Sequence, residues 1–384
     1  MRLRPSLDWL LILVPASLVL ELTGGPDLAI FLTSAAAILP LAGLIGRSTE
    51  QLALHTGPRV GGLINATFGN VTELIIAVFL ILEDKIEIVK ASLTGSILGN
   101  LLLVLGLSFL LGGLRHKEQH YNAHAASVHS TSLVLAVTGL LMPALFALGA
   151  HGGTVVQREV VSGTVAAVLI CLYLAALAFM LITHEHLFRT PDEEETPAWS
   201  RRRAIVMLLL ATGFVALESE FLVSSLEPAL ADVGLSEFFV GLILIPIVGN
   251  AAEHSSAVLF ALRNKVDVTL EIAIGSSTQV ALFVAPALVH ISLAVGHPID
   301  FVFSTFEVAA VALSTVLVFM ISSDDRSNWL ESAQLVGASV IMATRSSSWS
   351  ICERRAHARA RRGSLGARDR PARTRHHASQ RPVE

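Results

Sequence analysis

Long apolar stretches separated by short polar loops run along most of the chain. A helix needs about 20 apolar residues to cross the hydrocarbon core of a bilayer. Stretches of this kind cover residues 8–22, 27–46, 60–82, 88–112, 128–150, 160–183, 202–224, 236–261, 268–296, 299–322 and 329–343. The pattern therefore predicts an all-α polytopic membrane protein with about 11 transmembrane helices.

Composition supports this interpretation and excludes a soluble domain. Of the 384 residues, 53% are hydrophobic and 15% are charged, and the mean hydropathy is +0.66. The two cysteines, Cys171 and Cys352, offer neither a disulfide framework nor a CxxC metal site. We expect a protein embedded in the lipid bilayer that is not an enzyme and carries no cofactor.

Positive charges in the short loops predict the orientation of the helices, because Lys and Arg concentrate in cytoplasmic loops. The outside loops and adjoining helix starts carry only Lys85, Lys90 and Arg158. With a cytoplasmic N-terminus, the inside loops carry thirteen: Arg2, Arg4, Arg47, Arg59, Arg115, Lys117, Arg189, Arg201, Arg202, Arg203, Arg263, Lys265 and Arg326. We therefore expect the N-terminus in the cytoplasm. The short loops and the lack of an organelle-targeting segment favour a bacterial inner (plasma) membrane.

The two halves of the chain repeat each other in opposite orientation. Gly69-Asn70-Val71-Thr72-Glu73 recurs 180 positions later as Gly249-Asn250-Ala251-Ala252-Glu253, and Gly95-Ser96 recurs as Gly275-Ser276. Corresponding helices cross the membrane in opposite directions, which predicts two inverted five-helix repeats. The expected segments are an extra N-terminal helix (1–26), a first repeat (27–183), an acidic cytoplasmic linker (184–203), a second repeat (204–343) and a tail (344–384).

Two polar segments flank the second repeat. The linker contains Asp192-Glu193-Glu194-Glu195, and it is either a solvated loop or a segment that attracts cations to the cytoplasmic mouth. The tail after Thr344 holds eleven of the 27 Lys and Arg residues. A basic tail can bind anionic lipid or nucleic acid, but we expect it to be disordered or out of frame, with no nucleic-acid partner. An out-of-frame tail would truncate the last helix and leave an inactive membrane protein.

Two glutamates lie in the middle of predicted spans, within the repeated phrase. A carboxylate inside the hydrocarbon region is costly and usually serves a function. Asn70 precedes Glu73 by three residues, as Asn250 precedes Glu253, and on a helix residues three apart share a face. Such residues can also be structural helix–helix contacts. Their duplication in inverted halves instead predicts one paired ion site between the repeats.

Backbone irregularities accompany both phrases. Gly69 removes a side chain and loosens its helix, whereas Pro246, just before the second phrase, frees an upstream carbonyl group. Irregular backbone at membrane depth is tolerated where protein or a water-filled cavity satisfies it. Both breaks are therefore expected to face inward, toward each other.

Neutral oxygen donors follow each phrase along the chain. Two carboxylates surrounded by amides and hydroxyls suit a hard cation such as Ca²⁺, which binds about six to eight oxygens. A soft metal would need thiolate or imidazole ligands. The candidate donors are Ser92, Thr94, Ser96 and Asn100 in the first half, and Ser276, Ser277, Thr278 and Gln279 in the second.

Three further ionisable residues lie in predicted spans. His254 directly follows Glu253, and it is either a ligand or proton relay or a packing residue. Glu218 and Glu220 lie near the outer end of the span 202–224. They are either interfacial residues or part of an outer vestibule.

The buried carboxylates also indicate how transport would be driven. Burial in an apolar medium disfavours the charged form of a carboxyl group, so Glu73 and Glu253 can each be an anionic ligand or a neutral, protonated side chain. Cation binding would expel protons, and protonation from the other side would expel the cation. Alternating access of the two halves to a midplane site converts this competition into antiport.

Several motifs resemble the Ca²⁺/H⁺ antiporters of the cation/Ca²⁺ exchanger superfamily, over roughly residues 7–342. Besides the two Gly-Asn-x-x-Glu phrases they are Ala91-Ser92-Leu93-Thr94-Gly95-Ser96, Gly275-Ser276-Ser277-Thr278-Gln279, Glu118-Gln119, Ser219-Glu220-Phe221-Leu222-Val223 and Phe306-Glu307. The resemblance implies eleven spans, one N-terminal helix preceding two inverted five-helix repeats.

The resemblance also implies the roles of the site residues. Glu73 and Glu253 would be the cation and proton carboxylates, with Ca²⁺ and H⁺ as transported substrates. The histidine after Glu253 is similar to that of the proton-coupled branch. Exchange of Ca²⁺ with Na⁺ or K⁺, or transport of another divalent cation such as Mn²⁺, remains the alternative within this superfamily.

Overall fold

The computed structural model describes residues 7–148, 153–184, 196–322 and 326–344, and these residues are almost entirely helical. The first half begins with a 3-10 helix, η1, and includes two π-helical segments, η2 and η3, that continue α-helices. Its helices are η1 (Leu7–Ile12), α1 (Leu13–Thr23), α2 (Asp27–Thr56), α3 (Pro58–Phe68), α4 (Val71–Leu82), α5 (Ile86–Leu98), η2 (Gly99–Val104), α6 (Leu105–Arg115), α7 (Ala123–Leu148), α8 (Val155–Ala178) and η3 (Phe179–Thr183).

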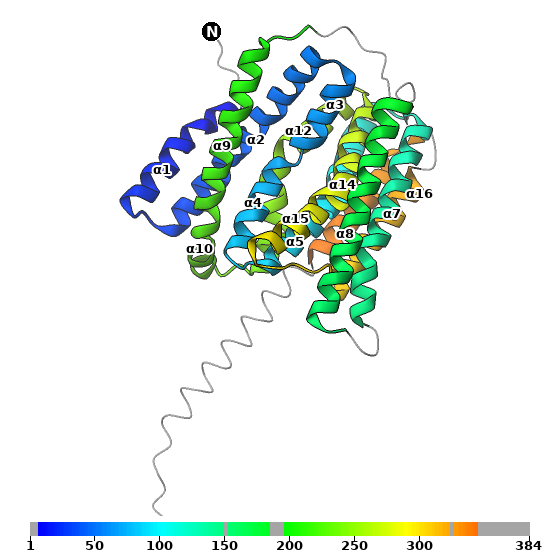
Figure 1. Cartoon of the computed structure of the whole chain (residues 1–384). Coiled ribbons are helices and arrows are strands. Elements are labelled where there is room, and N and C mark those ends of the chain that lie inside the picture. The colour runs from blue at the N-terminus through cyan, green and yellow to red at the C-terminus, as the bar shows by residue number, and fades with distance from the viewer. Residues whose placement is uncertain (1–6, 149–152, 185–195, 323–325, 345–384) are drawn as a thin grey trace, which may run out of the picture.

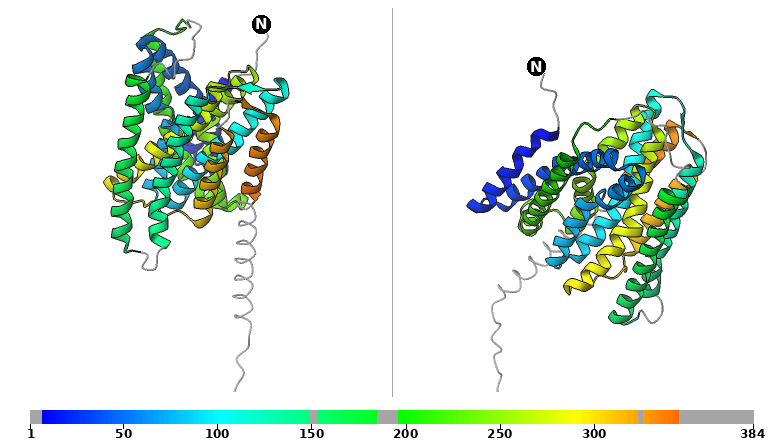
Figure 2. Two further views of the ribbon diagram at one scale, coloured as in Figure 1. Left: turned by 90° about the vertical axis from the view of Figure 1, so that its right-hand side faces the viewer. Right: turned by 45° about the horizontal axis from the view of Figure 1, so that its top comes forward.

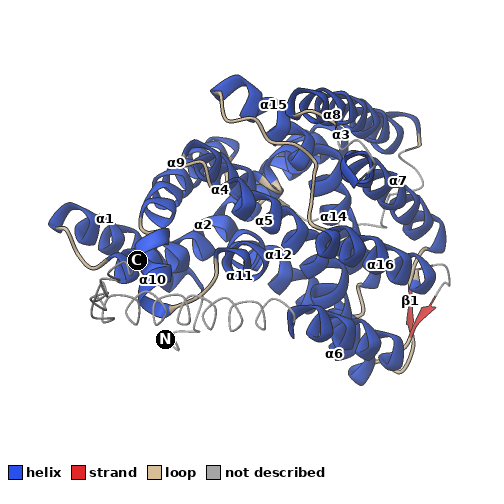
Figure 3. Cartoon of the chain, turned by 90° about the horizontal axis from the view of Figure 1, so that it is seen from below, coloured by secondary structure: helices blue, strands red, loops and turns tan. Residues whose placement is uncertain are grey.

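The second half contains three π-helical segments, η5 to η7, and ends in a helix over residues 329–344. A two-stranded antiparallel pair, β1 (Gln119–His120) with β2 (Arg326–Ser327), joins loops of the two halves and lies at one edge of the molecule (Figure 3). The helices are α9 (Arg201–Ser224), α10 (Leu226–Val233), α11 (Glu237–Phe239), η5 (Val240–Leu244), α12 (Ile245–Leu262), α13 (Val266–Leu270), η6 (Glu271–Gly275), α14 (Ser276–Gln279), η7 (Val280–Val284), α15 (Ala285–Val295) and α16 (Thr305–Ile321).

Eight helical stretches are long and apolar enough to cross a membrane. They are Asp27–Thr56, Arg59–Leu82, Ile86–Arg115, Ala126–Leu148, Val155–Thr183, Arg201–Ser224, Glu237–Leu262 and Val266–Val295. The other three predicted spans are present as shorter helices, namely η1 with α1, α16, and residues 329–344. The predicted all-α polytopic fold is thus confirmed. The predicted end of one span at residue 46 was too early, because α2 continues as a helix to Thr56.

The helices form two groups that lie side by side (Figure 1). α1, α2, α9 and α10 make the smaller group, in which α2 packs along α9 and α1 lies against α2. The other long helices make the larger group, and the view from below in Figure 3 shows both groups almost end-on. In the right-hand view of Figure 2, α1 lies at the outer edge of the smaller group. α2 also contacts α12, and α9 contacts α4, so each half's first helix packs on the other half.

Positive charge distinguishes the two ends of the helices. We call the end that carries Arg59, Arg115, Arg201 and Arg263 the Arg-rich side, which is at the top of Figure 1. The other end, called the opposite side, carries Lys85, which lies 2.7 Å from a carboxylate oxygen of the α10 residue Glu227.

The same tight turn joins corresponding helices of the two halves. Asp84 follows α4 and Asn264 follows α12, with positive φ angles of 56° and 61°. The amide of Lys85 donates to the carbonyl five residues earlier at 2.8 Å, and the amide of Lys265 does the same at 2.9 Å. Asp and Asn adopt left-handed backbone more readily than other residues with a side chain. The halves therefore fold alike locally, 180 positions apart.

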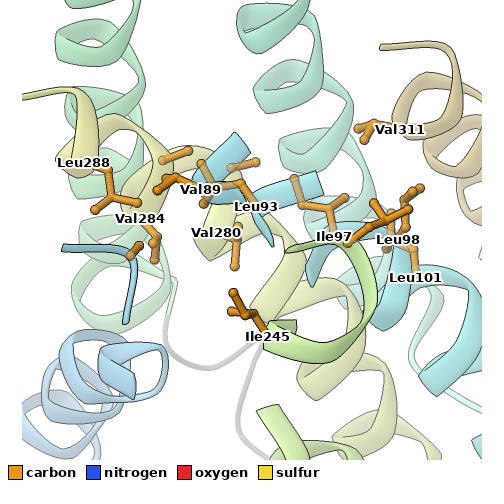
Figure 4. Packing of buried hydrophobic residues seen from close by; sticks show 14 of the residues in the cluster. Val89, Leu93, Ile97, Leu98, Leu101, Ile245, Val280, Val284, Leu288 and Val311 are labelled. Atoms are coloured by element: carbon orange, nitrogen blue, oxygen red, sulfur yellow. The ribbon is translucent and has the colours of Figure 1, made fainter. Parts of the chain in front are cut away.

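α5 lies at the centre of the larger group, and every residue from Ile88 to Leu98 is buried. Because it is covered all round, its residues are apolar or small on every face, except Lys90, whose ammonium group lies 2.7 Å from a carboxylate oxygen of Asp300. The buried side chains labelled in Figure 4 come from α5, η2, α12, η7, α15 and α16: Val89, Leu93, Ile97, Leu98, Leu101, Ile245, Val280, Val284, Leu288 and Val311.

Glycines bring α5 into backbone contact with η5. A Cβ atom on Gly95 would overlap the carbonyl oxygen of Leu242 and lie 2.8 Å from Pro246 Cγ. A Cβ atom on Gly241 would lie 2.7 Å from Ala91 Cβ. Small residues at a crossing point allow such close approach of membrane helices. The contact closes the larger group between the site described below and the opposite side.

The end of the inter-repeat linker is bound to α2. The side-chain oxygen of Gln51 accepts the amides of Ala198 and Trp199 at 2.7 and 2.9 Å. His55 Nε2 lies 2.7 Å from the Trp199 carbonyl oxygen, and the Arg203 guanidinium carbon lies 4.8 Å from the centre of the Trp199 ring. The predicted acidic stretch 192–195 lies outside the described residues.

The last predicted helix packs against the first half. Residues 329–344 are helical, and a Cβ atom on Gly106 of α6 would lie 2.8 Å from Leu335 Cβ. Trp329 similarly covers Gly113. The predicted basic tail after Thr344 lies outside the described residues.

Replacing Gly95 with alanine is expected to destabilise the fold by about 1 to 3 kcal/mol, because overpacking forces the backbone apart. The melting temperature of the detergent-purified protein measures this. Gly213→Ala is the matched control, since a Cβ atom at that helical position meets nothing within 4 Å. Equal melting temperatures for the two variants would contradict the close contact of α5 with η5.

Candidate functional site

The two repeated phrases meet in the interior, where the glycine of each lies beside the glutamate of the other, and Gly249 makes room for Glu73. A Cβ atom on Gly249 would lie 2.8 Å from Glu73 Cγ. A Cβ atom on Gly69 would lie 3.7 Å from Glu253 Oε1. Glu73 is in the first turn of α4, and Glu253 is in the middle of α12. The structure therefore brings Glu73 and Glu253 together where the two phrases meet.

One oxygen of Glu73 is held by donors from two other helices. Ser96 Oγ of α5 donates to Glu73 Oε1, and Asn250 Nδ2 of α12 donates to the same atom at 2.5 Å. Hydrogen bonds to a charged acceptor are stronger than those between neutral groups. The first half thus supplies the carboxylate, and both halves supply its donors.

A chain of hydrogen bonds continues from Asn70 to His254. Ser276 Oγ donates to Asn70 Oδ1 at 3.2 Å, and Asn100 Nδ2 donates to Ser276 Oγ at 3.3 Å. His254 Nε2 lies 3.0 Å from Asn100 Oδ1. Because an amide oxygen only accepts, that nitrogen is the donor. The Ser276 hydroxyl also faces Glu253, so the chain connects to the second carboxylate.

Gln279 and Tyr173 converge on one backbone carbonyl next to the helix break. Gln279 Nε2 donates to the carbonyl oxygen of Ala66, and Tyr173 Oη donates to the same oxygen at 3.1 Å. Gln279 Oε1 points toward the Gly69 position, as Glu253 does. Tyr173 comes from α8 and was missed by the sequence interpretation. The available signal was that it is the one tyrosine inside a predicted span, since the second, Tyr121, lies in a loop.

Two carboxylate oxygens at the site have no hydrogen-bond partner among the residues that the structure describes. Glu73 Oε2 and Glu253 Oε2 are both buried and unpaired, as is the amide nitrogen Asn70 Nδ2. An unpaired buried polar group is costly, and a charged one more so. A proton on each carboxyl group or a cation between them removes this cost. Oxygen atoms from two carboxylates, amides and hydroxyls form the type of site that binds Ca²⁺.

The helix break predicted in the first half is present, and in the second half the backbone is irregular just before Pro246 but unbroken at the phrase itself. α3 ends at Phe68 and α4 begins at Val71, so Gly69 and Asn70 lie between two half-helices. Asn70 consequently precedes α4 and does not share a helical face with Glu73 as predicted. α12 runs without interruption through Gly249 and Asn250. Its irregular backbone is η5, which ends one turn or so before the phrase, next to Pro246.

Other π-helical segments surround the site and were not predicted. Asn100 lies in η2, Gly275 ends η6, and Gln279 directly precedes η7. Segments of this kind often occur at functional sites, because one extra residue per turn changes the direction of the side chains that follow.

Four of the eight predicted neutral donors reach the site, and four do not. Ser96, Asn100, Ser276 and Gln279 take part in the contacts above. Ser92, Ser277 and Thr278 donate to carbonyl groups of their own helices, and Thr94 donates to Glu307 Oε1 at 3.3 Å. The hydroxyl protons of Ser92, Ser277 and Thr278 are thus bonded to the preceding helical turn, and these residues are not part of the network described above.

The prediction of an outer vestibule is wrong for Glu218. Its side chain, on α9, is fully buried and accepts a hydrogen bond from Ser17 Oγ of α1 at 2.6 Å. Glu220, on another face of α9, is exposed. A helical turn is 3.6 residues, so residues two apart point in different directions.

Comparisons place the chain among cation exchangers. A family model described as sodium/calcium exchanger protein matches residues 27–182 and 203–345. The chain is 42% identical over 349 residues to the Ca²⁺/H⁺ antiporter of Aphanothece halophytica, covering 87% of this chain and 94% of that protein. It is 43% identical over 336 residues to the Ca²⁺/H⁺ antiporter ChaA of Bacillus subtilis, covering 86% and 95%. The solved structure of native YfkE matches with a TM-score of 0.78 at 39% identity, over 89% of this chain and 99% of that one.

The chain's two tyrosines offer a matched test of the site. Tyr173 Oη bonds Ala66 at the site, whereas Tyr121 Oη donates to the Ile321 carbonyl at 2.9 Å away from it. Either Tyr→Phe variant is expected to lose about 1 kcal/mol of stability with its hydrogen bond. Only Tyr173→Phe should also weaken Ca²⁺ binding, by about threefold, because the Ala66 carbonyl keeps its second partner, Gln279. Isothermal titration with Ca²⁺ and thermal melting measure the two effects; equal Ca²⁺ affinity in both variants would contradict the assignment of Tyr173.

Proposed function

The chain belongs to the sodium/calcium exchanger protein family, and we propose that it exchanges Ca²⁺ for H⁺ across a membrane. Two relatives with more than 40% identity over most of the chain are named Ca²⁺/H⁺ antiporters, which are transporters. The observation that carries the proposal is the meeting of Glu73 and Glu253 with one unpaired, buried oxygen on each.

The geometry supports competition between the cation and protons. Two carboxylates in a low-dielectric interior repel each other, and each is also disfavoured in its charged form by desolvation. A divalent cation between them neutralises both, and a proton on each does the same without the cation. The site is therefore stable in two loading states that exclude each other. Exchange follows when the site opens alternately to the two sides.

Neutral groups around the pair provide the rest of the ligand set that we propose. Ser96 and Asn250 donate to Glu73, and the Ser276 hydroxyl faces Glu253. Asn70, Asn100 and Gln279 extend the network around them. His254 is placed to pass a proton through Asn100 to this network. His254 contacts Asn100 rather than either carboxylate, which favours a role as a proton relay over direct binding of the cation.

The remaining features of the proposal concern orientation and organisation. The Arg-rich side faces the cytoplasm, as does the N-terminus, and the membrane is a bacterial inner membrane; the loop charges support this. Residues 27–183 and 204–343 are the two inverted five-helix repeats, which the matching turns at Asp84 and Asn264 support. Residues 1–26 contribute an extra helix, and 184–203 link the repeats.

Transport into everted membrane vesicles tests the proposal. An acidic vesicle interior should drive ⁴⁵Ca²⁺ uptake by the wild-type chain. Glu73→Gln and Glu253→Gln should each lower the initial rate at least about tenfold, since ligand charge sets Ca²⁺ affinity over orders of magnitude. Glu87→Gln, at an exposed residue on the opposite side, is the control and should transport normally.

Two outcomes of that experiment would overturn the proposal. Uptake that survives both glutamate substitutions would remove the carboxylate pair from the mechanism. Uptake that requires a Na⁺ or K⁺ gradient and ignores the pH gradient would replace H⁺ as the counter-ion.

A further inference from the structure

One helical face leads from the Arg-rich side to the site. Asp267, Glu271, Gly275 and Gln279 follow one another at intervals of four along α13, η6 and α14, and all four are exposed or half-buried. Residues at this spacing share a helix face. Gln279, at the inner end, donates to the Ala66 carbonyl, next to the Gly69 position that Glu253 also approaches. A Cβ atom on Gly275 would lie 3.7 Å from Glu271 Cγ, so the Glu271 side chain lies on the same face, one turn further out.

Glu271 is the free acidic group on this approach. Asp267, at the outer end, accepts the backbone amide of Asn122 at 2.6 Å, which fixes it to the loop before α7. Among the described residues no hydrogen bond or ion pair is made by the Glu271 carboxylate, and its side chain is exposed. Among the described residues, no structural contact accounts for the Glu271 carboxylate at this position.

The helices that flank this face pack less closely than their counterparts in the first half. On the opposite side, Gly95 is covered by Leu242, and Gly241 by Ala91. The counterparts 180 positions away do not pack together: a Cβ atom on Gly275 has only Glu271 within 4 Å, and one on Gly61 meets Ala53 of α2. α3 and η6 therefore stand apart where α5 and η5 touch. The helices thus pack tightly on the opposite side of the site and less tightly on its Arg-rich side.

We propose that Glu271 receives Ca²⁺ on the Arg-rich side and guides it to the site formed by Glu73 and Glu253. This inference rests on the function proposed above. The Arg-rich side carries Arg59, Arg115 and Arg263, whose charges repel a divalent cation. A carboxylate set within low-dielectric walls focuses the field and raises the local cation concentration. The counterpart of Glu271 in the first half is Ala91, on the opposite side, which already carries Glu83 and Glu227.

The same comparison predicts where Glu271 lies when α3 packs against η6. Ala91 is the residue against which Gly241 packs. If the second half adopts the arrangement now seen in the first, Gly61 packs against residue 271. A glycine at that point leaves space for the longer side chain. Glu271 is thus accessible in one state and covered by α3 in the other.

Transport kinetics measured from one side test the proposal. With Ca²⁺ presented to the Arg-rich side, E271Q should raise the KM for Ca²⁺ by about threefold to tenfold and leave Vmax unchanged, because the carboxylate acts on encounter. E271D should restore most of the affinity. The matched control E87Q removes an exposed carboxylate on the opposite side of the molecule and should leave this KM unaltered. The effect of E271Q should shrink at high ionic strength, which screens exposed charges.

Accessibility provides an independent measurement. In a chain with Cys171 and Cys352 replaced by serine, Glu271→Cys should react with a membrane-impermeant thiol reagent only from the Arg-rich side. A Ca²⁺ or pH gradient that drives the site toward the opposite side should slow the reaction. Equal reaction from both sides, or a rate independent of the gradient, would overturn the proposed covering by α3.

The outcomes separate this inference from the function on which it rests. If wild-type vesicles show no proton-driven Ca²⁺ uptake, the proposed antiport fails. If uptake is normal and E271Q leaves KM unchanged, or lowers only Vmax, antiport stands and the assignment of Glu271 to cation entry is wrong.

Discussion

Two glutamates can occupy a dry interior together only when the surrounding chain supplies partners, space and a neutralising charge. In this protein Gly249 supplies the space for Glu73, and Gly69 lies next to Glu253. The partners come from other helices, with Ser96 and Asn250 both bound to one oxygen of Glu73. The neutralising charge is left to the transported ions. Much of the architecture, including the broken helix and the π-helical segments, follows from holding this pair.

The site pair was predictable because duplication makes it visible in the sequence. A phrase that recurs after 180 positions, in helices of opposite direction, identifies a symmetric site without any knowledge of contacts. Long apolar stretches likewise located the spans, since the hydrocarbon core fixes their length. The exact ends were less predictable. α2 extends past its apolar part to Thr56, because a helix continues into the polar layer when its hydrogen bonds remain satisfied.

Features that depend on contacts between distant segments could not be predicted from periodicity. Tyr173 looks like any buried aromatic residue until α8 is placed beside Ala66. Ser92 and Thr278 match the pattern of ligands, yet each bonds to its own helix. Glu218 appeared interfacial, whereas α1 covers it and supplies the Ser17 hydroxyl. The π-helical segments leave no signal in the apolar pattern, because one extra residue shifts a face without changing its composition.

The reciprocity of the two glycines restricts how this chain can change over evolution. A bulkier residue at Gly249 would displace a carboxylate that belongs to the first half, and one at Gly69 would crowd a carboxylate of the second. Neither half can then drift independently, although each has its own helices and turns. Chimeras that join the first half of this chain to the second half of a diverged relative would inherit mismatched contacts at the centre. Duplication supplied two halves, and their shared site has since kept them a matched pair.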